Sequence, residues 1–172
     1  AAGYTMPLPE KDEMFITKGQ LLQDIMVSLG GRIAEEIIFG DITTGASSDI
    51  KKATSAARDM VTRYGMSENI GVINYNSDDD EVFIGRDLAH AKNHSELISG
   101  EIDREVKAII DDCYKKAKDI ILAHMDVLHH CAELLIVKEK IGREEFEALF
   151  DQKENDPESF FENHEIGESA QK

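Results

Sequence analysis

Apolar residues recur at three- and four-residue intervals along two long stretches of this 172-residue chain. The first stretch lies between Leu21 and Ile38, and the second lies between Ile98 and Leu135. This spacing gathers the apolar side chains on one face of a helix, whereas a half-buried strand alternates every two residues. Each helical face must be buried against another element. The sequence therefore predicts a mainly α-helical fold.

Local signals set the ends of the first helix. Thr17 and Gln20 have the spacing of a capping box, and Gly40 is suited to the residue that ends a helix. Gly30 and Gly31 lie inside this helix, where each costs about 1 kcal/mol relative to alanine. We therefore expect either a kink at these glycines or a neighbour that packs very close to them.

The limits of the other helices are predicted by residues of the same kinds. Serine is a good N-cap, glycine adopts the left-handed conformation past a helix end, and a very long periodic pattern implies two helices. We expect these limits at Ser47 or Ser48, Gly65, Ser95, a break near His124 to Asp126, and a last short helix from Gly142 to near Phe150.

A small β component is also predicted. Residues 1–9 include Pro7 and Pro9, which lack backbone donors, so we expect an edge strand or an extended arm. Ile70–Tyr75 and Glu81–Gly85 flank an acidic loop and have the composition of a β-hairpin. The expected fold class is mainly α with a small β-hairpin and edge strand.

Composition limits the class of protein. The net charge of −16 repels phosphate backbones, so nucleic acid is not an expected partner. No apolar run approaches the roughly 20 residues of a membrane span. Cys113 and Cys131 fall on apolar helical stripes and are predicted to be small buried residues. Residues 151–172 are acidic and lack periodicity, so we expect one domain over residues 1–150 and a disordered tail.

One turn places a carboxylate at the start of a helix. Residues Thr44 to Asp49 read TGASSD, and an aspartate in a first helical turn is favoured by the helix dipole. A zinc site needs three or four converging ligands, and this aspartate is only one. From the residues alone, Asp49 is explained as a well-placed helix start.

The order of motifs resembles the peptidase domain of the FtsH family, which are membrane-anchored AAA+ zinc proteases. The resemblance covers nearly all of residues 1–150 and rests on many segments that occur in the same order. These segments are Gly3-Tyr4-Thr5, Leu29–Arg32, Ala34–Glu36, Thr44–Asp49, Ala53–Thr54, Ala57–Val61, Gly65–Glu68, Glu81–Asp87, Ser95 and Ile102–Val106.

The resemblance implies that Asp49 is the third zinc ligand. In this family the first two ligands are the histidines of an HExxH helix, which this sequence does not contain. His90 and His94 have the four-residue spacing but lack the glutamate after the first histidine. Three protein ligands leave the fourth zinc position open for water and the scissile carbonyl.

Other residues acquire roles through the same resemblance. Glu35 resembles a carboxylate near the metal that accepts a hydrogen bond from a ligand histidine, although a solvated or paired helix residue is the alternative. For Glu36 the four-residue helix spacing, and not the resemblance, leads us to expect that it faces solvent or pairs with Arg32. Gly3-Tyr4-Thr5 resembles the strand that lines the active cleft and binds substrate by strand addition, with a frayed terminus as the alternative.

The resemblance also implies a larger protein. It would be an ATP-dependent zinc endopeptidase that forms a homo-hexamer, is anchored in the bacterial cytoplasmic membrane, and degrades membrane and misfolded proteins. This domain would lie in the cytoplasm, and ATP and Mg would bind an ATPase module whose P-loop is not in this sequence.

We expect the chain alone to be soluble. We also expect it to be inactive, because it offers one candidate zinc ligand and no general base. The alternative is a non-catalytic helical interaction or oligomerisation module. An HExxH segment before Ala1 would favour the peptidase.

Overall fold

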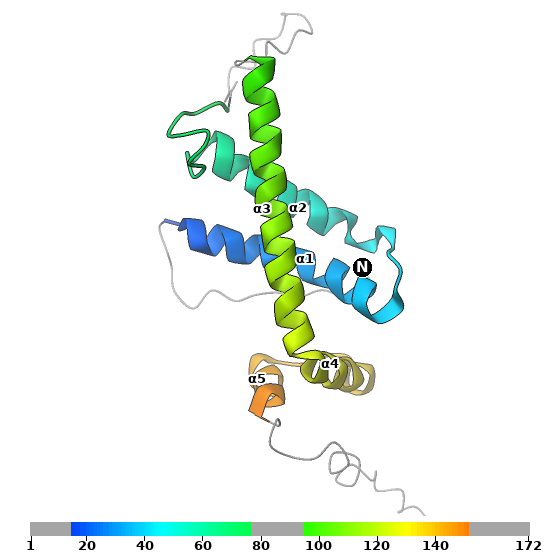
Figure 1. The fold of residues 1–172 in the computed structure, drawn as a ribbon. Coiled ribbons are helices and arrows are strands. Elements are labelled where there is room, and N and C mark those ends of the chain that lie inside the picture. The colour runs from blue at the N-terminus through cyan, green and yellow to red at the C-terminus, as the bar shows by residue number, and fades with distance from the viewer. Residues whose placement is uncertain (1–14, 77–94, 152–172) are drawn as a thin grey trace, which may run out of the picture. The chain divides into compact units, whose positions relative to one another are not determined.

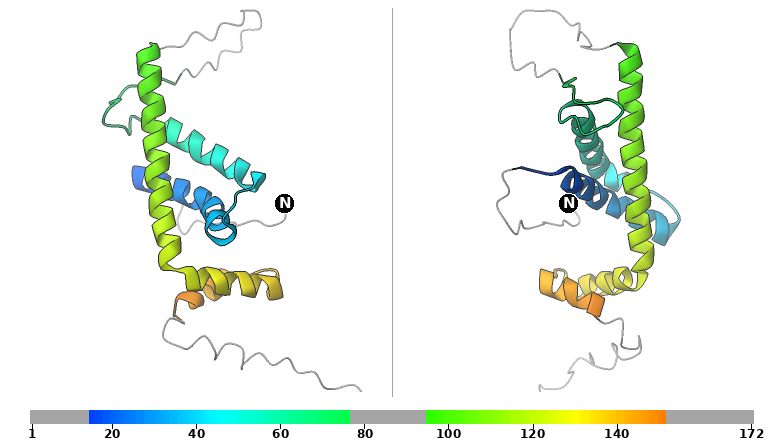
Figure 2. Two further views of the ribbon diagram at one scale, coloured as in Figure 1. Left: turned by 45° about the vertical axis from the view of Figure 1, so that its right-hand side comes forward. Right: turned by 60° about the vertical axis from the view of Figure 1, so that its left-hand side comes forward.

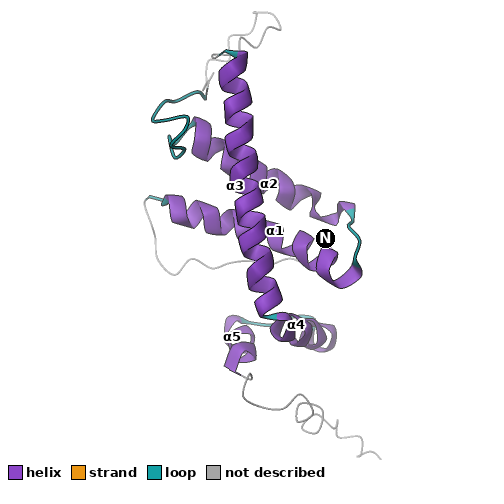
Figure 3. Cartoon of the chain, viewed as in Figure 1, coloured by secondary structure: helices purple, strands orange, loops and turns teal. Residues whose placement is uncertain are grey.

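The computed structural model describes residues 15–76 and 95–151 of the chain. Within these ranges every regular element is helical (Figure 3). The chain divides into two compact units, residues 1–120 and residues 121–172. The mainly α-helical prediction is confirmed. In order, the elements are α1 (Lys18–Phe39), the short 3-10 helix η1 (Thr44–Ala46), α2 (Ser47–Thr62), α3 (Glu96–Ala123), α4 (Met125–Lys138) and α5 (Arg143–Asp151).

Helices α1 and α2 lie side by side and run in opposite directions (Figures 1 and 2). The predicted capping box starts α1, because the Thr17 hydroxyl accepts from the Gln20 N–H at 3.2 Å and the Gln20 side chain accepts from the Thr17 N–H at 2.7 Å. Gly40 ends α1 with a φ of 62°, and its N–H donates to the Glu36 carbonyl at 3.0 Å. Both predicted ends of α1 are confirmed.

The core of the first unit lies where α3 crosses α1 and α2 (Figure 1). Alanines on α2 leave room for its neighbours to approach closely. Burying a large aliphatic side chain contributes roughly 1.5–3 kcal/mol relative to leaving it exposed. The buried apolar residues of these three helices are Ile25, Leu29 and Ile33 of α1, Ala53, Ala57, Met60 and Val61 of α2, and Ile102, Val106, Cys113 and Ala117 of α3.

The two cysteines are free thiols in this structure. Cys113 is buried as predicted, and its Sγ lies 3.7 Å from the Leu22 carbonyl oxygen. Burial raises the pKa of the Cys113 thiol above its usual value. Cys131 is only half-buried, so the prediction of full burial is met by one of the two residues.

Polar contacts also join α3 to α1 and α2. Arg58 of α2 pairs with Asp103 of α3 at 2.8 Å. Glu36 of α1 accepts hydrogen bonds from the Tyr114 hydroxyl and, at 2.9 Å, from Lys118 Nζ, both on α3. The Glu36 side chain is still 40% exposed, so the expectation that it faces solvent is met in part, but its hydrogen-bond partners lie on α3 and not at Arg32. Burial of the apolar faces brings α3 against α1, and Glu36 lies at the border of that contact.

The glycine pair inside α1 does not interrupt the helix. An added Cβ at Gly30 or Gly31 would meet no atom within 4 Å among the neighbours that the structure describes. The very close neighbour that we expected as one explanation is therefore not found in the described ranges.

The segment after α2 is not a strand. Residues 70–75 have no regular structure, and the Tyr75 N–H donates to the Thr62 carbonyl at the end of α2 at 2.8 Å. Gly71, with a φ of 80°, allows this return of the chain. The first half of the predicted hairpin is thus corrected. The second half, residues 81–85, and the predicted edge strand in residues 1–9 lie outside the described residues, as do residues 152–172 of the predicted tail.

The second unit contains α4 and α5. The predicted break is confirmed, since α3 ends at Ala123 and α4 begins at Met125. Val127 of α4 and Leu149 of α5 are buried, and the rings of Phe146 and Phe150 meet edge to face at 5.5 Å. In the described ranges no single helix is long and apolar enough to cross a membrane, and α3 and α4 reach that criterion only when taken together across their break.

Candidate functional site

Seven residues connect α1 to α2, and a threonine organises them. Thr43 is extended, with φ of −114° and ψ of 174°, and its hydroxyl accepts from the Gly45 N–H at 3.1 Å. This bond caps η1, which leads directly into α2. The first residue of α2 is Ser47, as predicted, but its N-cap is Ala46, which has no side chain to accept a hydrogen bond. The predicted serine cap is therefore wrong, and a threonine four residues before Ser47 supplies the cap.

Glu35 of α1 binds this connection with both carboxylate oxygens. Its Oε1 accepts from the Thr43 hydroxyl at 2.6 Å, and its Oε2 accepts from the Thr43 N–H at 3.3 Å. Arg32 Nη1 lies 4.0 Å from Oε2. The Thr43 hydroxyl, followed by the Thr43 N–H, holds the pKa of Glu35 below its usual value.

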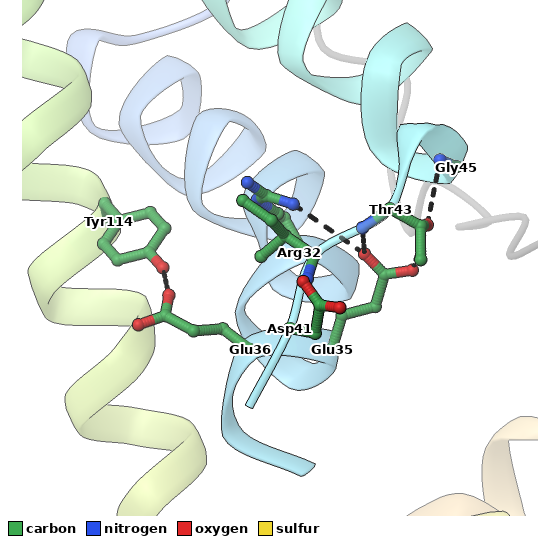
Figure 4. Close-up of polar contacts among 8 residues, drawn as sticks. Arg32, Glu35, Glu36, Asp41, Thr43, Gly45 and Tyr114 are labelled. Carbon is green, nitrogen blue, oxygen red and sulfur yellow. Dashed lines mark hydrogen bonds and ion pairs between the residues drawn. The ribbon is translucent and has the colours of Figure 1, made fainter. Parts of the chain in front are cut away.

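The adjacent carboxylates of Glu35 and Glu36 serve different contacts (Figure 4). Glu36 extends toward Tyr114 on α3, whereas Glu35 extends toward Thr43 in the connection. The hydrogen bond from Tyr114, followed by that from Lys118, holds the pKa of Glu36 below its usual value. Glu36 therefore joins α1 to α3, and Glu35 fixes the connection between α1 and α2.

Asp49 lies in the first turn of α2, where the helix dipole favours its negative charge. Its side chain is 47% exposed, and its Oδ1 lies 3.4 Å from Nζ of Lys52, which is 70% exposed. An exposed pair of this kind contributes at most about 1 kcal/mol, so a stronger ligand can displace the lysine. The carboxylate is thus accessible and is attached to the start of a well-formed helix.

A carboxylate oxygen is a competent zinc donor, so Asp49 fits one ligand position of a zinc site. Across residues 15–76 and 95–151, no three His, Cys, Asp or Glu side chains gather closely enough to hold a metal ion. The described residues therefore supply one ligand position of such a site. Gly3, Tyr4 and Thr5 lie outside the described residues, so their predicted place at a substrate cleft stays a prediction.

Two residues of this region were missed by sequence reasoning. The role of Thr43 could have been suspected from its place before TGA, because threonine is a good cap, but the serines nearer to α2 competed with it. The role of Tyr114 had no local signal, because its partner Glu36 lies 78 residues away.

Comparison with known proteins supplies the context for this geometry. Residues 1–149 match Peptidase family M41. The "ATP-dependent zinc metalloprotease FtsH" of Caldicellulosiruptor bescii is 50% identical over 149 residues, which are 87% of this chain and 24% of that protein. "FtsH 1" of a Thermoanaerobacter species is 48% identical, and FtsH of Thermotoga maritima is 42% identical, each over 87% of this chain and 24% of the relative.

The chain thus spans about a quarter of the length of these relatives. The match extends over α1, the connection, α2 and the long helices that follow, and it includes Asp49 and Glu35. The chain belongs to Peptidase family M41 and corresponds to part of the peptidase domain of the FtsH zinc metalloproteases.

Proposed function

We propose that this chain is the C-terminal portion of the peptidase domain of an ATP-dependent zinc metalloendopeptidase, and that Asp49 is its zinc ligand. The observation that carries the proposal is the continuous family match over residues 1–149. The exposed carboxylate of Asp49 at the start of α2 supports it, because a ligand must be accessible and firmly held.

The chain's contribution to the chemistry is to hold and aim one ligand. Zinc in a site with an open position polarises a peptide carbonyl and lowers the pKa of water. Asp49 supplies negative charge at a helix start, where the backbone is rigid and the dipole stabilises the carboxylate. The remaining two ligands and the general base are proposed to come from an HExxH helix that precedes these residues.

The other properties of the complete protein follow as parts of the same proposal. It is a homo-hexamer anchored in the bacterial cytoplasmic membrane, with this domain in the cytoplasm, and it uses ATP and Mg in a separate ATPase module. Its substrates are membrane and misfolded proteins, bound in part along Gly3-Tyr4-Thr5. The names of the relatives, which describe an ATP-dependent zinc metalloprotease, support the ATP and zinc requirements.

Zinc retention in the full-length protein tests the role of Asp49. We expect the wild-type protein to keep one zinc ion per chain after dialysis against a weak chelator, and Asp49→Asn to lose most of it together with ATP-dependent peptidase activity. Asp59→Asn is the matched control, because it removes an aspartate charge from the same helix. Full zinc retention by Asp49→Asn would overturn the assignment.

The isolated chain provides a second test. We expect it to bind zinc only weakly and to leave a casein substrate uncleaved, because one carboxylate cannot replace a three-ligand site. Tight binding of one zinc ion with peptide turnover by residues 1–172 would contradict the proposed division of the site.

A further inference from the structure

We propose that Thr43 is a positioning residue for Asp49: its hydroxyl connects Glu35 of α1 to the start of α2 and thereby sets the direction of the carboxylate. This inference rests on the proposed function of Asp49 as a zinc ligand. It assigns a task to a residue that neither the family resemblance nor the helix pattern singled out.

The Thr43 hydroxyl makes two directed contacts at once. It donates its hydrogen to Glu35 Oε1 at 2.6 Å and accepts from the Gly45 N–H at 3.1 Å (Figure 4). A hydroxyl has one hydrogen, so donation to Glu35 sets its rotation and turns a lone pair toward Gly45. The Thr43 N–H also donates to Glu35 Oε2 at 3.3 Å, which fixes the backbone of the same residue.

The start of α2 depends on this contact, because α2 has no side-chain cap of its own. The Ser47 N–H donates to the Thr44 carbonyl, so η1 passes directly into α2. Ala46, which is 8% exposed, anchors η1 against the rest of the unit. Asp49, whose carboxylate this contact positions, is four residues beyond Gly45.

The space around Gly45 shows how closely the connection is fitted. A Cβ at this position would lie 3.2 Å from the Thr43 hydroxyl oxygen and 3.8 Å from Glu35 Oε1. The Thr43 hydroxyl and one Glu35 carboxylate oxygen therefore lie next to the η1 backbone.

This arrangement differs from a direct role for Glu35 on a ligand histidine. If Glu35 acts on a ligand histidine, removal of the Thr43 hydroxyl frees the Glu35 carboxylate for that contact and does not weaken zinc binding. If the hydroxyl connects Glu35 to η1, its removal releases the start of α2 while Asp49 itself is intact. Thr43→Val separates the two possibilities, since it removes the hydroxyl and keeps a branched side chain.

The experiment measures zinc affinity of the full-length protein by competition with a chromophoric chelator. Outer-shell substitutions cost about 10–100-fold in metal affinity, and we expect about tenfold weaker binding for Thr43→Val. Thr43→Ser restores the hydroxyl and should return the affinity to within about threefold of wild type. Thr54→Val is the matched control, because the Thr54 hydroxyl donates only to the Ile50 carbonyl of α2, at 2.8 Å.

Thermal unfolding of the zinc-free variants, measured in parallel, separates ligand positioning from loss of fold. We expect Thr43→Val to lose zinc affinity while its zinc-free unfolding temperature stays close to that of Thr54→Val. Wild-type zinc affinity in Thr43→Val, equal losses in Thr43→Val and Thr54→Val, or failure of Thr43→Ser to restore binding would each overturn the inference. Asp49→Asn is included because its full retention of zinc would instead overturn the proposed function.

Discussion

The two ends of α2 are held by the same device in different surroundings. At the N-terminal end, Glu35 of α1 accepts from the Thr43 hydroxyl at 2.6 Å, and that hydroxyl accepts from the Gly45 N–H. The carboxylate belongs to a neighbouring helix, and the hydroxyl links that carboxylate to a backbone N–H of the turn before α2.

At the C-terminal end, Glu105 of α3 has the position that Glu35 has at the N-terminal end. Its Oε2 accepts from the Ser67 hydroxyl, also at 2.6 Å, and the Ser67 hydroxyl accepts from the Ile70 N–H at 3.3 Å. Asn69 donates to the other oxygen of Glu105 at 2.6 Å. Here too a helix carboxylate orders a turn through a hydroxyl.

Burial distinguishes the two ends. Ser67 is 6% exposed and Ile70 is 7% exposed, whereas Thr43 and Gly45 are exposed. Water can replace a lost partner at the exposed end, but a buried group left without its partner costs about 1–3 kcal/mol. The buried end is therefore expected to contribute more to stability, and the exposed end to the local direction of the chain.

The largest difference between the ends is expected at their glycines. Gly65 has a φ of 60°, and an added Cβ would lie 3.1 Å from the Val72 Cα. An alanine in the left-handed region costs about 1–2 kcal/mol, and the contact with the Val72 backbone adds to this. We expect Gly65→Ala to lower the free energy of unfolding by about 2 kcal/mol or more, as measured by urea denaturation.

Gly45→Ala is the counterpart at the exposed end. Gly45 is not among the glycines with positive φ, and its added Cβ would lie 3.2 Å from a hydroxyl oxygen. Alanine lowers the conformational entropy of the unfolded chain, and this stabilising effect partly offsets the cost of the close contact. We therefore expect the free energy of unfolding to stay within about 1 kcal/mol of the wild-type value. A larger loss from Gly45→Ala than from Gly65→Ala would reverse the comparison.

The next effect is expected from removal of the buried hydroxyl. Ser67→Ala leaves the Ile70 N–H and one Glu105 oxygen without their partner, so we expect a loss of about 1–2 kcal/mol in the free energy of unfolding. Ser99→Ala is the control, because the exposed Ser99 hydroxyl donates only to the Ser95 carbonyl at 3.3 Å. It should stay within about 0.5 kcal/mol of wild type. Equal losses in the two variants would show that burial does not govern this contact.

A smaller loss of stability is expected from removal of the Thr43 hydroxyl at the exposed end of α2. Replacing a helix-capping threonine by a residue without a hydroxyl typically costs about 1 kcal/mol, and water at Thr43 reduces the cost. We therefore expect Thr43→Val to lose less stability than Ser67→Ala in the same urea titration, and Thr43→Ser to match wild type. A Thr43→Val loss that exceeds the Ser67→Ala loss would show that the exposed end is the stronger support of the fold.

The helix ends could be predicted because their signals are local. The Thr17 capping box, Gly40 and the Ser95 cap each involve residues within four positions, and the structure contains all three. The location of Asp49 in a first helical turn was predicted for the same reason. Spacing alone, however, does not show which side chain supplies a cap when several candidates are adjacent, as at Thr43 and Ser47.

The contacts between helices could not be predicted in this way. Glu36 meets Tyr114 and Lys118 only after α3 has packed across α1, and the sequence carries no signal for that crossing. The strand predicted over Ile70–Tyr75 failed because β-branched composition does not ensure a pairing partner, and the end of α2 binds the Tyr75 N–H instead. The candidate zinc site has the same limit, since its other ligands must come from elsewhere.

The smallest expected effect concerns the pH dependence of stability. The Ser67 hydroxyl, followed by the Asn69 amide, holds the pKa of Glu105 below the usual glutamate value of about 4.3. Between the folded and unfolded pKa values the unfolded chain binds more protons, so the free energy of unfolding rises with pH in that window. The stabilisation is complete above the unfolded pKa and is lost as pH falls through the folded pKa.

Glu105→Gln removes the titrating group and should flatten the stability curve below about pH 4.3. Urea titrations over a pH series measure the slope, and Glu101→Gln, one turn earlier on α3, controls for the loss of one negative charge. Ser67→Ala removes the largest cause of the lowered pKa, so it should flatten the same region in part. A slope unchanged by Glu105→Gln would mean that the hydrogen bonds to Glu105 at the buried end of α2 do not couple proton binding to folding.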